Sequence, residues 1–101
     1  MRREVVELVH SATGERALHE ILDLRLAEGT YESESHGDGV LEHLIVHAGE
    51  MLVGPHGQQV HLRAGDFVSF TANCPHSYES LYGETRATLV VFYPARAPDR
   101  C

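Results

Sequence analysis

The sequence predicts an all-β domain built as a small barrel, because apolar and polar residues alternate along it and turn signals recur at short intervals. Its 101 residues suffice for one hydrophobic core and are too few for two. We therefore expect a single domain over residues 1–101, with loose ends at 1–3 and 95–101.

The first clear alternation lies near residue 22. Leu22, Leu24 and Leu26 are separated by the charged residues Asp23 and Arg25. Residues 14–26 also contain helix formers, but a period of two over this stretch is the stronger signal. A strand is therefore predicted there.

Two further strands are predicted from the same period in the second half of the chain. Val60 and Leu62 alternate with polar residues, and Ser69 stands between Val68 and Phe70. Turn chemistry divides the chain at Thr13-Gly14, Glu28-Gly29, Gly37-Asp38-Gly39, Ala48-Gly49-Glu50, Gly54-Pro55-His56-Gly57, Ala64-Gly65-Asp66, Asn73-Cys74-Pro75 and Tyr82-Gly83. This spacing leaves no room for a long helix and favours strands closed into a barrel.

The last strand is predicted over residues 86–93. Its β-branched and aromatic side chains predict burial on both faces. Pro94 ends it because proline cannot donate to a β-ladder.

Charge and hydropathy exclude several classes of function. Eight arginines and no lysine face fifteen carboxylates, so the net charge of −7 opposes direct nucleic-acid binding by this chain. No apolar run is long enough for a membrane span, and no secretory segment follows the start, so a cytoplasmic protein is expected. Phosphate-loop, dinucleotide and nucleophile-elbow motifs are absent from the sequence.

Candidate metal ligands lie close together before and within a predicted strand. His36, Asp38 and Glu42 are all even-numbered, so in an extended chain they share a face with the apolar Leu44 and Val46. Three side chains that bind metals would therefore point toward the core.

A fourth candidate ligand, His76, opens the strand after Asn73-Cys74-Pro75, and Tyr78 follows on the same face. Imidazole and carboxylate ligands suit a divalent metal such as Mn, Fe, Ni or Zn. The alternative is a constellation that holds no metal and is hydrogen-bonded internally.

These residues resemble the two motifs of the cupin family. In the first motif His36, Glu42 and Gly49 stand at the family's positions, with Asp38 in place of a second histidine. The resemblance implies a single jelly-roll barrel, also called a double-stranded β-helix, with His36, Asp38, Glu42 and His76 as the metal ligands.

The second motif is matched by Gly65 and His76 at the family's spacing. It departs from the pattern at Thr71, Asn73 and Ser80. The chain is most similar to the C-terminal cupin domain of helix-turn-helix regulators of the xenobiotic-response-element type, on the pairs Glu42-His43, Gly49-Glu50, Gly65-Asp66, Pro75-His76 and Tyr93-Pro94. Few residues precede the first strand, so we expect either a free-standing relative or a domain cut from a longer regulator.

The remaining histidines and aromatics have two interpretations. His43 and His47 share the strand face opposite Glu42, which predicts a place in solvent or at a subunit contact rather than a zinc pair. His10, His19, His56 and His61 have no partner that the sequence identifies. Four aromatic residues would either line a ligand cavity or fill the barrel: Tyr78, Phe67, Phe70 and Phe92.

Two functions follow from the resemblance. The first is a ligand-binding module that senses a small molecule, directly or through a metal, and acts on a DNA-binding partner or domain. The second is a metal-dependent enzyme of dioxygenase or isomerase type, in which the same four residues hold Fe or Mn. Predicted edge strands and the apolar face of Leu41 and Ile45 indicate a homodimer.

Overall fold

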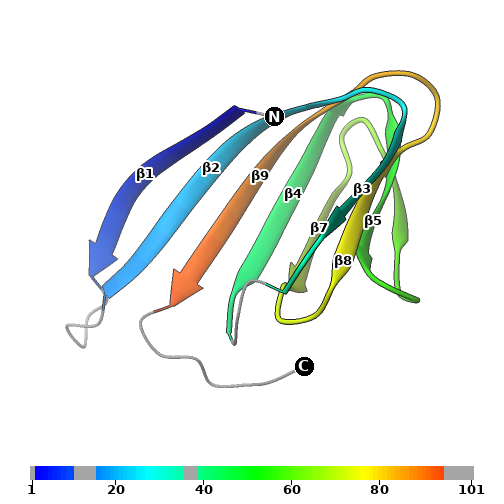
Figure 1. The fold of residues 1–101 in the computed structure, drawn as a ribbon. Helices are drawn as coiled ribbons and strands as arrows, with labels where there is room; N and C mark the ends of the chain where they lie inside the picture. The colour runs from blue at the N-terminus through cyan, green and yellow to red at the C-terminus, as the bar shows by residue number, and fades with distance from the viewer. Residues whose placement is uncertain (1, 11–15, 36–38, 95–101) are drawn as a thin grey trace.

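The computed structural model describes the backbone of residues 2–10, 16–35 and 39–94, and the side chains of residues 19–35 and 39–93. Within these ranges the chain forms nine strands and no helix (Figure 1). The strands are β1 (Arg2–His10), β2 (Arg16–Leu26), β3 (Gly29–Ser33), β4 (Leu41–Ala48), β5 (Glu50–Pro55), β6 (Val60–Arg63), β7 (Phe67–Thr71), β8 (His76–Ser80) and β9 (Thr85–Pro94). Among the described residues, no helix could cross a membrane.

The strands form two antiparallel sheets. The larger has the order β1-β2-β9-β4-β7, and the smaller has the order β3-β8-β5-β6. Chain neighbours such as β3 and β4 lie in different sheets, as Figure 1 shows. This arrangement is a small jelly-roll barrel, which confirms the predicted fold class.

The core lies between the two sheets and is built from the alternating residues that the sequence analysis singled out. On β2 the three leucines at 22, 24 and 26 are buried and the residues between them are exposed. The buried apolar side chains are Leu22, Leu24, Leu26, Val40, Leu44, Val46, Met51, Val53, Leu62, Ala72, Tyr78, Ala87, Leu89 and Val91. The prediction of a strand rather than a helix near residue 22 is confirmed.

Strand β9 corrects one expectation. Ala87, Leu89 and Val91 are buried, whereas the alternate residues Thr88 and Val90 are only half-buried. β9 pairs with β2 on one side and β4 on the other, so its backbone is central, but the second sheet covers only one face. The predicted burial on both faces was wrong because β-branched and aromatic residues also suit a half-covered face in the centre of a sheet.

One tight connection requires glycine. Gly49 joins β4 to β5 with φ of +89°, a backbone conformation that residues with a side chain rarely adopt. A Cβ there would lie 2.6 Å from the carbonyl oxygen of Glu84 and 2.9 Å from Cα of Thr85. The turn therefore packs directly on the start of β9.

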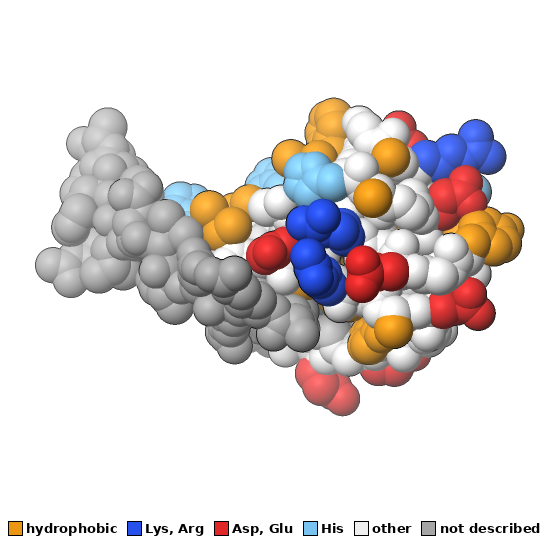
Figure 2. Space-filling model, turned by 90° about the horizontal axis from the view of Figure 1, so that it is seen from above, with side chains coloured by type: hydrophobic (Ala, Val, Ile, Leu, Met, Phe, Trp, Pro, Cys, Tyr) orange, Lys and Arg blue, Asp and Glu red, His pale blue; other side chains and the backbone are white. Residues whose placement is uncertain are grey.

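Charged side chains of both signs lie close together on one face of the molecule. Figure 2 shows basic, acidic and hydrophobic side chains interspersed over the face seen from above. The excess of carboxylates therefore forms no single acidic patch among the coloured side chains of this view.

Candidate functional site

Glu42 is a carboxylate in the core. It lies on β4 between two residues that point outward, and its side chain has 0% exposure. The alternation of β4 directs it between the sheets together with the apolar Leu44 and Val46. A buried carboxylate is costly unless charges or hydrogen bonds compensate it, so its surroundings decide its role.

His76 is the first partner of Glu42. It begins β8, is also 0% exposed, and its Nε2 lies 3.1 Å from Oε2 of Glu42. Its other ring nitrogen, Nδ1, lies 2.9 Å from the carbonyl oxygen of Cys74. The loop before β8 therefore orients the ring so that Nε2 faces the carboxylate.

The surroundings of His76 favour its charged form. Burial alone would lower the pKa of His76, but the hydrogen bonds to Glu42 and to the Cys74 carbonyl, with the negative charge of Glu42, raise it above its ordinary value. Both ring nitrogens face oxygen acceptors, which an imidazolium satisfies with two N–H groups. The charged form of His76 would therefore lie directly beside the carboxyl group of Glu42.

Tyr78 completes a triad with Glu42 and His76. Its hydroxyl donates to Oε1 of Glu42 and lies 3.1 Å from Nε2 of His76. Burial raises the pKa of Tyr78, and the negative charge of Glu42 and the hydrogen bond to it raise it further. The phenol is therefore a hydrogen-bond donor at neutral pH in this arrangement.

Two of the four predicted metal ligands are brought together by the structure. Glu42 and His76 meet in the core, whereas His36 and Asp38 lie outside the described residues. In the described ranges, no three His, Cys, Asp or Glu side chains gather into a group that could hold a metal.

The donor atoms that are described fit a metal ion. Adjacent ligands of an octahedral ion, each about 2.1 Å from it, lie about 3 Å apart. Nε2 of His76 and Oε2 of Glu42 are 3.1 Å apart, and Nδ1 is already committed to a backbone carbonyl, as is usual for a metal-bound histidine. The nitrogen and oxygen donors suit Mn, Fe, Ni or Zn.

The four candidate aromatics fall in different places. Tyr78 is in the triad, and Phe70 packs against the core with its ring edge-on to His76 at 5.5 Å between centroids. Phe67 is 71% exposed, and Phe92 lies against His19 on the outer face of the larger sheet, 4.7 Å between ring centroids. Phe67 and Phe92 thus point away from the space between the sheets.

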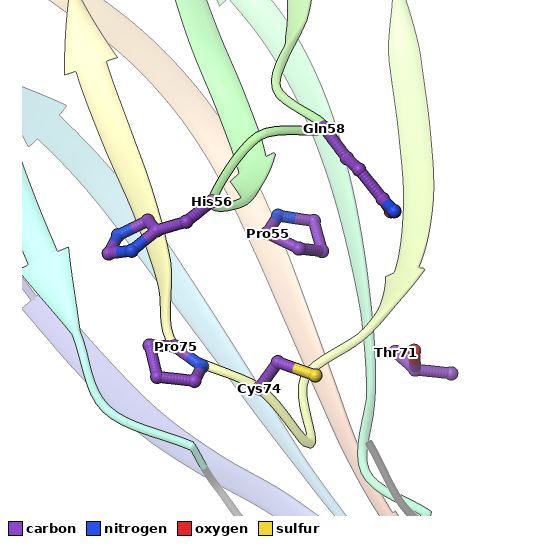
Figure 3. Close-up of a pocket in the computed structure, with 6 residues that line it drawn as sticks. All are labelled: Pro55, His56, Gln58, Thr71, Cys74 and Pro75. Carbon is purple, nitrogen blue, oxygen red and sulfur yellow. The ribbon is translucent and has the colours of Figure 1, made fainter.

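A cavity of about 340 Å³ lies where two loops approach each other (Figure 3). Its walls are the end of β5 with the turn that follows, and the end of β7 with the loop before β8. The lining residues are Pro55, His56, Gln58, Thr71, Cys74 and Pro75. Cys74 also contacts the triad, because its carbonyl accepts the hydrogen bond from Nδ1 of His76. The backbone N–H of His56 donates to the carbonyl of Pro75 at 3.3 Å, which ties the two loops together.

Sequence reasoning did not assign these residues to a cavity. The turn residues at 54–57 and 73–75 predict the two loops. A local turn pattern does not predict which other loop will lie beside it in the fold. His56 also bonds Glu32 through Nε2 at 2.8 Å, a contact between distant segments that no local pattern indicates.

The outer face of β4 holds two of the other histidines. His43 shares a 2.6 Å hydrogen bond with Ser69, and His47 shares a 2.7 Å hydrogen bond with Thr88. Both are exposed, as the alternation predicted.

The chain matches the family model described as a cupin domain over residues 22–93. It is 25% identical to an HTH_3 family transcriptional regulator from Vibrio cholerae, with a TM-score of 0.65, covering 92% of this chain and 52% of that one. The chain thus spans about half the length of that regulator. No curated protein matches.

Two further solved structures share the fold. One is the Cupin_2 domain of an XRE family transcriptional regulator from Enterobacter cloacae, with 24% identity, a TM-score of 0.58 and coverage of 92% of this chain and 97% of that one. The other is KdgF from Halomonas sp., with 15% identity, a TM-score of 0.59 and coverage of 93% and 78%.

Proposed function

The chain belongs to the cupin domain family, and on that premise we propose that it binds a small molecule over a metal centre held by Glu42 and His76. The observation that carries the proposal is the pair itself: two ionisable side chains with 0% exposure and donor atoms 3.1 Å apart. Well-packed leucine side chains would stabilise a barrel of this size as well as a buried ion pair does. The position of this pair between the sheets therefore favours a binding role.

The metal would be Mn, Fe, Ni or Zn, with His36 and Asp38 completing the ligand set. When bound, such an ion supplies a Lewis acid with open positions for oxygen atoms of a ligand. In the structure, hydrogen bonds with Tyr78 and with the Cys74 carbonyl orient Glu42 and His76 and so fix the direction of both donor atoms.

The small molecule would occupy the cavity where the two loops approach each other. Its volume of about 340 Å³ suits a small metabolite, with apolar prolines on the walls and the polar side chains of Gln58 and Thr71 for orientation. Cys74 lines the cavity and its carbonyl is hydrogen-bonded to His76, so a molecule there would contact a residue that touches the metal ligand.

The proposed output is regulatory. The likeness to the regulator from Vibrio cholerae supports an effector-sensing domain, with DNA contacts made by another segment or partner. The net charge of −7 agrees, because an acidic domain gains no affinity from the phosphate backbone.

Equilibrium dialysis of the untagged protein against Mn²⁺, Fe²⁺, Ni²⁺ or Zn²⁺ tests the metal centre. We expect about one ion per chain, and at least about a tenfold loss of affinity in Glu42→Gln and in His76→Ala. His47→Ala is the matched control, since His47 lies on the same strand as Glu42 but on its outer face. Equal binding in all four proteins would contradict the proposal.

An enzyme would differ in one measurement. Oxygen consumption by the iron-loaded protein that disappears in Glu42→Gln would assign dioxygenase chemistry to the site in place of sensing. Binding of metal without turnover agrees with the sensing role.

The proposed assembly is a homodimer through the outer face of the larger sheet. Ile45 and Phe67 pair across β4 and β7 and are 44% and 71% exposed. We expect light scattering to give a dimer mass, and Ile45→Asp to give a monomer mass, because the charge would have to be buried at the contact. A monomer mass for the unaltered chain across the micromolar range would contradict this.

A further inference from the structure

The hydroxyl of Tyr78 contacts both side chains of the proposed metal centre. It lies 3.1 Å from Nε2 of His76, the same separation that joins Nε2 to Oε2 of Glu42. It also contacts the other carboxylate oxygen of Glu42 through a hydrogen bond. Nε2 of His76 therefore lies at the spacing of adjacent ligands around one ion from both the hydroxyl of Tyr78 and Oε2 of Glu42.

We propose that Tyr78 is itself a metal ligand, so that the centre takes a hard, highly charged cation such as ferric iron. This inference rests on the proposed metal centre and adds Tyr78 to its ligands. On coordination the phenol loses its proton to water and its oxygen binds the ion, with no change in the oxidation state of any group.

Backbone pairing and burial fix the position of the Tyr78 side chain. Its backbone pairs with Val53 of β5 on one side and with Tyr31 of β3 on the other, in the middle of the smaller sheet. Its side chain is buried, and the ring stands edge-on to His76, with 5.5 Å between centroids. A side chain fixed in this way presents its oxygen in one direction.

The choice of cation follows from the donor set. A carboxylate and a phenolate are hard anionic oxygens, and one imidazole is the sole nitrogen in the triad. Such donors favour ferric iron over Zn²⁺ or Ni²⁺, which gain more from additional imidazole or thiolate ligands. The phenolate thus distinguishes this centre from one built on imidazole and carboxylate alone.

The test uses the full chain without a tag. Iron is supplied as the ferric nitrilotriacetate complex, excess is removed, and iron per chain is measured together with visible absorption. We expect about one iron per chain and a coloured phenolate-to-iron charge-transfer band. In Tyr78→Phe the band should vanish and the affinity for iron should fall about tenfold or more.

Tyr82→Phe is the control, because Tyr82 is 76% exposed in the turn between β8 and β9 and should change neither reading. Iron bound without the band, or a band that survives in Tyr78→Phe, would overturn the role of Tyr78 and leave the metal centre intact. A chain that takes up neither ferric iron nor a divalent ion would overturn both proposals.

The spectrum of the unaltered protein decides the matter even if Tyr78→Phe does not fold. Resonance Raman scattering excited in the band should show tyrosinate ring modes that shift when the protein is made with ring-deuterated tyrosine. Absence of those modes in the iron-loaded protein would overturn the assignment.

Discussion

Each face of β4 carries both ionisable and aliphatic residues, but their surroundings differ. On the inner face Glu42 and Leu44 are fully buried, and Glu42 meets His76 in the core. On the outer face His43, Ile45 and His47 are all exposed. Neighbouring residues of one strand thus experience nearly opposite surroundings.

The two faces of β4 differ in whether water can replace a lost hydrogen bond. Outside, His43 and His47 bond the hydroxyls of Ser69 and Thr88, and water can take over either contact. Inside, the side chain of Glu42 is 0% exposed, so the loss of a partner leaves a buried polar group uncompensated.

The largest difference between the faces is expected from truncating adjacent apolar residues. Leu44→Ala should lower the free energy of unfolding by about 2–5 kcal/mol, because Leu44 is 0% exposed and its loss leaves a cavity between the sheets. Ile45→Ala, one residue along, should cost less than about 1 kcal/mol in the monomer. Urea unfolding of both variants measures the comparison, and equal losses would show that the outer face is covered.

Much of the fold could be predicted from the sequence because core-facing residues recur at every second position along the strands. The leucines of β2 and the residues Glu42, Leu44 and Val46 of β4 are buried as predicted. The prediction was wrong for β9, where a pattern typical of double burial occurs in a strand with one half-covered face. The residue composition of a strand indicates which faces can be buried, whereas the actual burial of a face depends on whether the other sheet covers it.

The candidate site was predictable only in part. Glu42 and His76 could be chosen because their positions resemble a family pattern, and Tyr78 because it shares the face of His76. The hydrogen bond from Tyr78 to Glu42 joins residues 36 positions apart and has no local signal. The cavity has none either, since two loops from different strands form it.

A smaller effect, confined to the inner face, is expected from pH. Burial opposes the charge on His76, but the hydrogen bonds and the charge of Glu42 outweigh it, so the pKa of His76 is raised in the folded protein. A raised folded pKa stabilises the protein fully below the unfolded pKa, and this contribution is lost as pH rises through the folded value. With a chelator present, the free energy of unfolding should therefore fall as pH rises above 6.5.

The control for this pH dependence is His76→Gln, which removes the titrating ring from the triad. The other described histidines remain in that variant, so the difference between the two pH profiles isolates His76. Parallel profiles for the two proteins would show that the imidazole of His76 is equally protonated in the folded and unfolded chains.

The smallest effect is expected on the outer face, from His47→Ala. The side chain is exposed and its 2.7 Å contact with Thr88 can be replaced by water, so the free energy of unfolding should change by less than about 0.5 kcal/mol. Metal binding should be unchanged, because β4 directs His47 away from Glu42. A loss of bound metal in this variant, measured by the same dialysis, would mean that the outer histidines hold the ion. The contrast between the two faces of β4 would then be reversed.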